Sequence, residues 1–60
     1  MSKDTFSVVY KFGYERYIFL EDSLATTFVA QGLGRLRSSG HSKDNAVDWV
    51  LELNEELNND

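Results

Sequence analysis

The alternation of side-chain types near the start of the chain constrains the fold more than any other feature. In the run TFSVVYKFG, large apolar side chains occupy every second position from Phe6 to Phe12. This period of two, built from aromatic and β-branched residues, predicts a strand with one buried face. A second apolar run, YIFL at residues 17–20, follows Gly13. We therefore predict an antiparallel β-hairpin over residues 5–21, with a short turn near Gly13 to Glu15.

The second predicted strand is apolar on both of its faces. Tyr17 and Phe19 point to one side, and Ile18 and Leu20 point to the other. A strand of this kind is usually covered on both sides. We expect a helix to cover one face and a partner chain to cover the other.

Two helices are predicted after the hairpin. Asp22 or Ser23 can cap the first helix, and apolar residues then recur at helical spacing, which predicts a helix over residues 23–38. Gly32 and Gly34 weaken its interior by roughly 1 kcal/mol each. Arg35 and Arg37 would lie in its last turn, where cations interact favourably with the helix dipole.

The second helix is predicted over residues 43–57, with Ser42 as its cap. Its apolar stripe comprises Ala46, Trp49, Val50, Leu53 and Leu57, widened by Val47 and Leu51. The expected fold class is therefore α+β: an N-terminal β-hairpin followed by two α-helices (ββαα), in one domain over residues 1–60.

The size of the chain limits how it can be stabilised. Sixty residues lie near the lower limit for independent folding, where disulfides, a metal or a partner subunit usually add stability. The chain has no cysteine and one histidine, which excludes disulfides and argues against a structural zinc site. We expect a homodimer without a cofactor. We also expect a cytoplasmic protein that does not bind membranes, because the sequence shows neither a spanning segment nor a signal peptide.

Charge is distributed unevenly along the chain. Residues 1–43 carry six basic against four acidic side chains, whereas residues 44–60 carry six acidic side chains and no basic one. A spacing of four residues predicts that most of these acids form a ridge on the last helix, with neighbouring carboxylates about 6 Å apart along its axis. The predicted partner-binding residues are Asp44, Asp48, Glu52, Glu55 and Glu56, and Asp60 continues the ridge. The other interpretation is an ordinary solvated helix face, although like charges four residues apart destabilise a helix slightly.

The remaining motifs favour structural roles. The aromatic residues of the hairpin resemble a base-stacking platform but have only Lys11 and Arg16 nearby, so we assign most of them to the core. The segment GLGRLRSSG lacks the lysine and the spacing of a phosphate-binding loop. His41 stands among serines, yet a chain of this size can scarcely enclose a hydrolytic site. We expect no enzymatic activity and no catalytic or metal-binding residues.

Two segments resemble parts of known families. GHSKDNAVDWVLEL, at residues 40–53, resembles the loop and second helix of ribbon-helix-helix repressors, and YIFLEDSLATTF, at residues 17–28, is similar to their strand and first helix. That resemblance implies a dimeric DNA-binding regulator whose strand reads bases in the major groove. Arg16 is the only good base-reading residue at the matching positions. NAVDWVLEL is also similar to the last helix of ubiquitin-associated domains, although the predicted strands contradict a three-helix bundle. We assign no family on these resemblances.

The function that we expect is non-catalytic protein binding. The chain would act as a small acidic inhibitor or adaptor that presents its last helix to a basic site on a larger protein, for example one that handles nucleic acid. A viral or mobile-element origin suits a short, compact, acidic chain. Two alternatives remain open: a DNA-binding regulator of the ribbon-helix-helix type, which would bind nucleic acid, and a structural subunit of a larger assembly.

Overall fold

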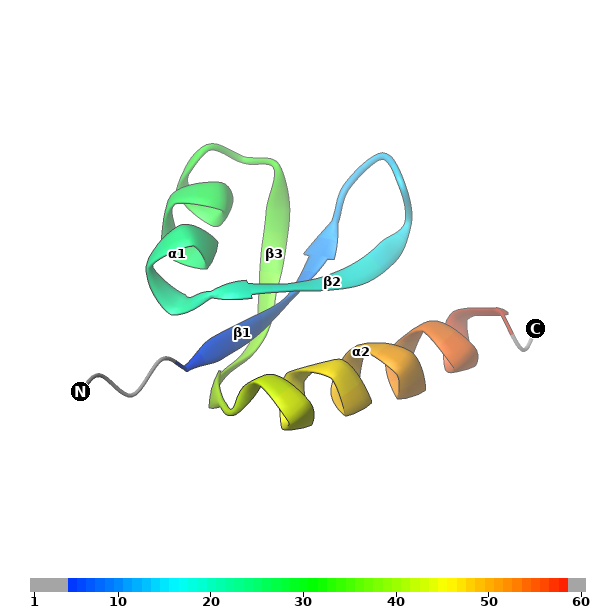
Figure 1. The fold of residues 1–60 in the computed structure, drawn as a ribbon. Coiled ribbons are helices and arrows are strands. Elements are labelled where there is room, and N and C mark those ends of the chain that lie inside the picture. The colour runs from blue at the N-terminus through cyan, green and yellow to red at the C-terminus, as the bar shows by residue number, and fades with distance from the viewer. Residues whose placement is uncertain (1–4, 59–60) are drawn as a thin grey trace.

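The computed structural model describes residues 5–58, which form three strands and two helices in the order ββαβα (Figure 1). The elements are β1 (Phe6–Lys11), β2 (Arg16–Glu21), α1 (Asp22–Ala30), β3 (Gly34–His41) and α2 (Lys43–Asn58). The strands form one antiparallel sheet in the order β2-β1-β3, so β1 is central. The α+β class is confirmed, but the predicted order ββαα is wrong.

The predicted hairpin is confirmed. β1 and β2 pair from Phe6 opposite Glu21 to Lys11 opposite Arg16. The turn between them contains Gly13 at φ +90° and Glu15 at φ +53°, and the Glu15 N–H donates to the Lys11 carbonyl at 3.1 Å. Glycine adopts this left-handed region without steric cost, which explains its place in the turn.

The predicted helix over residues 23–38 is instead a helix, a turn and a strand. α1 ends at Ala30, and Gly32 then takes a φ of +77°, which stops the helix. The Gly32 N–H donates to the Val29 carbonyl at 2.9 Å, as expected for a chain turning away from a helix end. The chain then runs back antiparallel to β1 as β3. Arg35 and Arg37 accordingly lie on a strand and not in the last turn of a helix.

Gly34 allows β3 to approach the rest of the molecule closely. A Cβ atom at this buried position would lie 2.5 Å from the Tyr10 carbonyl oxygen and 2.6 Å from the Phe28 ring. Such distances are well inside van der Waals contact, so only glycine fits without movement of its neighbours. The glycine thus fixes where β3 begins, beneath α1 and beside β1.

The two helices cover opposite faces of the sheet (Figure 1). The Val9 side chain and the Phe28 ring of α1 both lie against Gly34, which places Val9 on the face of the sheet that α1 covers. Its neighbour Tyr10 points the other way, packs against Tyr17 and lines a cleft together with Leu57 of α2. Both helices contact β2, and its apolar residues 17–20 are half-buried, so the protein's own helices cover part of each face of this strand. The expected partner chain stays a prediction.

The fully enclosed core is small. Its buried apolar side chains are Val8, Val9, Ala25, Ala46 and Leu53. Large apolar side chains on both helices and on β3 stay substantially exposed, among them Leu24, Leu36 and Leu51. Little apolar area thus holds the chain together, and polar contacts between elements gain importance.

Polar contacts fix α2 at two places. The Ser42 hydroxyl accepts the backbone N–H of Asn45 at 3.3 Å, which confirms Ser42 as the cap of this helix. Further along, the Asn54 side chain accepts the Tyr17 N–H at 2.7 Å and donates to the Tyr17 carbonyl at 3.1 Å. Asn54 thus occupies the outer backbone edge of β2 at Tyr17, as a neighbouring strand would.

Candidate binding surfaces

The five predicted partner-binding residues all lie exposed on α2. They are Asp44, Asp48, Glu52, Glu55 and Glu56. The opposite side of the helix buries Ala46 and Leu53 against the sheet. The acidic side chains are therefore free of any role in the core, and we call them, with Leu51, the acidic face.

Leu51 lies exposed at the border of this acidic face and not in the buried apolar stripe that the sequence pattern extended to it. It is 62% exposed. Residues three and four apart on a helix are neighbours, so Leu51 adjoins Asp48 and Glu55 on one flank and the half-buried Val47 and Asn54 on the other. The acidic face therefore combines a field of carboxylates with one apolar side chain that can contact a partner directly.

The arginines of β3 line a separate cleft. Arg35 and Arg37 are both exposed and, with Tyr10, Tyr17 and Leu57, border a hollow of about 490 Å³ beside α2. The sequence pattern placed these arginines near a helix end. The strand instead places them on the sheet, near the carboxyl end of the acidic helix.

The aromatic side chains of the hairpin pack mainly against one another. Phe6 meets Phe19 and Tyr10 meets Tyr17 in edge-to-face geometry, with ring centroids 5.9 and 5.2 Å apart. All four side chains are half-buried. The structural role predicted for these four rings agrees with this packing, whereas Tyr14 in the turn is exposed and lies under the Lys11 ammonium at 4.0 Å.

Ser38 and His41 form a close polar pair. The Ser38 Oγ lies 2.6 Å from His41 Nε2, and the His41 ring packs against Trp49 with centroids 5.5 Å apart. The carboxylate of Asp22 points to Thr5 and Ser7, so it does not orient the imidazole as the third member of a triad would. The pair fixes the irregular end of β3, where its register against β1 shifts.

The Asp22 side chain accepts two side-chain hydrogen bonds, although the sequence analysis considered it only as a cap of the first helix. The residue at the cap position of α1 is Glu21, and no side chain makes a capping hydrogen bond there. The Thr5 hydroxyl donates to Oδ2 of Asp22, and the Ser7 hydroxyl donates to Oδ1 at 2.6 Å. These hydroxyls, first Ser7 and then Thr5, hold the pKa of the Asp22 carboxyl below its ordinary value, with smaller contributions from the Gly40 backbone and His41. Asp22 therefore stays ionised at neutral pH.

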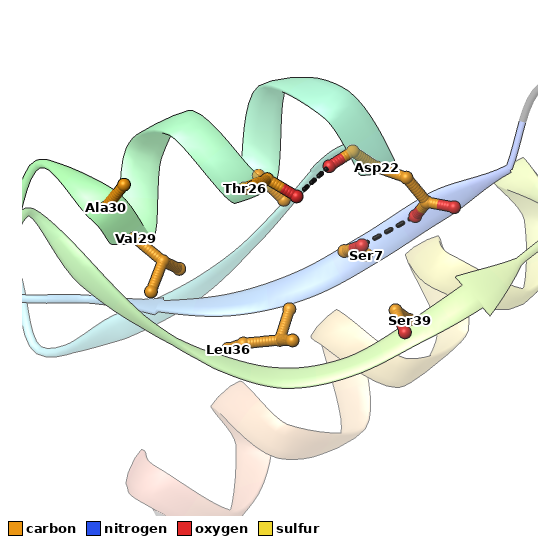
Figure 2. A pocket seen from close by; sticks show the side chains of 8 residues that line it. Ser7, Asp22, Thr26, Val29, Ala30, Leu36 and Ser39 are labelled. Atoms are coloured by element: carbon orange, nitrogen blue, oxygen red, sulfur yellow. Dashed lines mark hydrogen bonds between the residues drawn. The ribbon is translucent and has the colours of Figure 1, made fainter.

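Asp22 stands at one end of a hollow of about 410 Å³ between α1 and β3 (Figure 2). Ser7 and Ser39 lie near it, while Val29 and Ala30 of α1 line the other end and Leu36 of β3 lies between (Figure 2). We call this the α1–β3 hollow. The sequence gives no clear signal for it, because Ser7 shares its face of β1 with Val9 and Lys11 and does not stand out there, although the structure buries it.

Residues 5–58 contain neither a metal-binding cluster nor a membrane-spanning helix. No group of three or more histidine or acidic side chains among them is arranged to hold a metal ion. None of the helices in that part of the chain combines the length and the hydropathy that a membrane span requires.

Comparisons with known proteins add no relatives. No protein-family model matches the sequence, and comparisons with curated proteins and with solved structures find no match either. The ribbon-helix-helix resemblance also conflicts with the fold, because β3 separates the two helices that follow one another directly in that family. No family is therefore assigned to the chain, and its fold is described as a ββαβα domain.

Proposed function

We propose that this protein is a non-catalytic binding protein that presents the acidic face of α2 to a basic site on a larger protein. The observation that carries the proposal is the exposure of all five carboxylates along one helix whose opposite side packs on the sheet. Because the core does not use them, these side chains can meet a partner without any rearrangement of the fold.

Two features support recognition over simple solvation. The acidic face carries no basic residue between Asp44 and Asn58, so its field is of one sign and steers basic partners toward it. Leu51 adds an exposed apolar contact beside the carboxylates. An apolar side chain that a partner desolvates adds affinity, whereas charges at the rim of an interface mainly set the rate of association.

The proposal is tested by reversing charge on the acidic face. We expect the double substitution Asp48→Lys/Glu52→Lys to abolish capture of a cytoplasmic protein partner from lysate, while the far-ultraviolet circular dichroism stays unchanged. The matched control is Glu15→Lys/Glu21→Lys, which makes the same charge change at exposed positions outside α2. Leu51→Ala should weaken the same interaction without affecting the fold.

The outcomes separate the proposed function from its alternatives. A partner that is captured equally by the reversed variant would remove the acidic face from the interaction. If no protein is captured and the purified chain instead binds duplex DNA with steep salt dependence, the arginines of β3 become the binding residues and the chain a nucleic-acid-binding regulator.

A further inference from the structure

The α1–β3 hollow has an apolar end and a negatively charged end, which together suit an amphipathic cation. Its apolar end is lined by Val29, Ala30 and Leu36, and its polar end carries the ionised Asp22 (Figure 2). Leu36 is 50% exposed, so a large part of the apolar wall lies in contact with water. A ligand with an apolar stem and a positive head would cover the wall and pair with the carboxylate.

We propose that this hollow receives a lysine side chain of a bound protein, with its methylene stem against Val29 and Leu36 and its ammonium at Asp22. The proposal rests on the proposed function in one respect, namely that the partner carries basic side chains. The lysine would make a contact separate from the one at the acidic face, because α1 and α2 cover opposite faces of the sheet (Figure 1).

The arrangement of hydrogen bonds at Asp22 favours lysine over arginine. Each carboxylate oxygen already accepts one hydroxyl, from Thr5 on Oδ2 and from Ser7 on Oδ1, and the Gly40 backbone also bonds this carboxylate. A guanidinium binds a carboxylate best through both oxygens at once, where it would compete with these two hydroxyls. An ammonium needs only one remaining acceptor position on the carboxylate, and Ser39, which lines the same hollow, supplies a further hydroxyl acceptor.

The test uses the purified chain and small probes, so it does not depend on finding the partner. Butylamine, butanol and butylguanidine are titrated separately at neutral pH, and binding is followed by NMR of backbone amides and methyl groups. We expect butylamine to shift the methyl signals of Ala25, Val29 and Leu36 and to bind about fivefold tighter than butanol, the upper range for a partly exposed ion pair.

Substitutions at the apolar end supply the control. Ala30→Leu fills that end of the hollow at an exposed helical position, where leucine is well tolerated, and should abolish the shifts. Thr27→Leu places the same side chain on the exposed part of α1 outside the hollow and should leave them intact. Asp22→Asn should remove the preference for the amine over the alcohol.

Several results would overturn the proposal. One is butanol binding as tightly as butylamine, and another is the absence of any shift in the hollow. Amine-induced shifts confined to α2 would show general attraction to the acidic face, and equal or tighter binding of butylguanidine would replace lysine with arginine. The binding of these probes does not depend on charge reversal at Asp48 and Glu52. Failure here therefore leaves the proposed function standing, and failure of the proposed function leaves the binding of butylamine unchanged but removes the basic partner that would supply the lysine.

Discussion

Asn54→Ala should weaken the attachment of α2 to the sheet. The Asn54 side chain makes two hydrogen bonds to the backbone of Tyr17, at 2.7 and 3.1 Å, from a half-buried position. Alanine removes both bonds, so that the outer N–H and C=O groups of Tyr17 must form hydrogen bonds to water instead. The acidic face would keep its composition but lose one of the contacts that hold it against the sheet.

The expected loss of stability follows from opposing contributions. Two hydrogen bonds at about 1 kcal/mol each give a loss of about 2 kcal/mol. Alanine is a better helix former than asparagine, which returns roughly 0.6 kcal/mol. The net decrease in the free energy of unfolding should therefore be about 1.5 kcal/mol, a large fraction of the stability of so small a chain.

Urea denaturation followed by circular dichroism measures this change. A slope of about 1 kcal/mol per molar urea converts the loss into a midpoint lower by about 1.5 M. Asn45→Ala is the matched control, because Asn45 is exposed on the same helix and uses its backbone, not its side chain, to bond Ser42. Equal midpoints for Asn54→Ala and the control would refute the assigned role of Asn54.

Two other perturbations test the fold. Gly34→Ala should lower the free energy of unfolding by about 2 kcal/mol, because the new Cβ would clash with the Tyr10 carbonyl and the Phe28 ring. The midpoint of thermal unfolding should fall by roughly 10 °C, whereas an unchanged midpoint would show that β3 moves to accommodate the methyl group. The lowered pKa of Asp22 stabilises the fold above its unfolded-state value of 3.8, and this contribution is lost as the pH falls through the lower folded-state pKa. Urea midpoints at about pH 5 and about pH 3 should therefore differ less in Asp22→Asn than in the parent chain, and an equal difference in both would remove Asp22 as a source of the acid sensitivity.

Local patterns predicted the hairpin and the last helix well. The alternation from Phe6 to Lys11 requires only neighbouring residues, and so does the apolar stripe of α2. The error lay between them, where Leu33 and Leu36 fit a helical period although they belong to a turn and a strand. Two glycines within three residues and the alternation after Gly34 were the signals for β3, and tertiary packing under α1 decided the outcome.

The candidate binding surfaces were predictable to different extents. Exposure of the acidic residues on α2 follows from the pattern of a single helix, so the sequence sufficed. The α1–β3 hollow depends on residues distant in the chain, such as Ser7, Asp22 and Ser39, and on a strand that was not expected. A site of this kind cannot be predicted until the order of the elements is correct.

The central place of β1 has a consequence for how the chain folds. β1 first meets β2 across a short turn, but its other edge must wait for β3, which follows only after α1 has crossed the sheet. Pairing between residues so far apart in the chain carries an entropic cost for loop closure and slows folding. We therefore expect the hairpin to form early and the addition of β3 to limit the folding rate. Substitutions in β3 would then change the rate of that limiting step, and substitutions in the hairpin turn would change the population of the hairpin that forms before it.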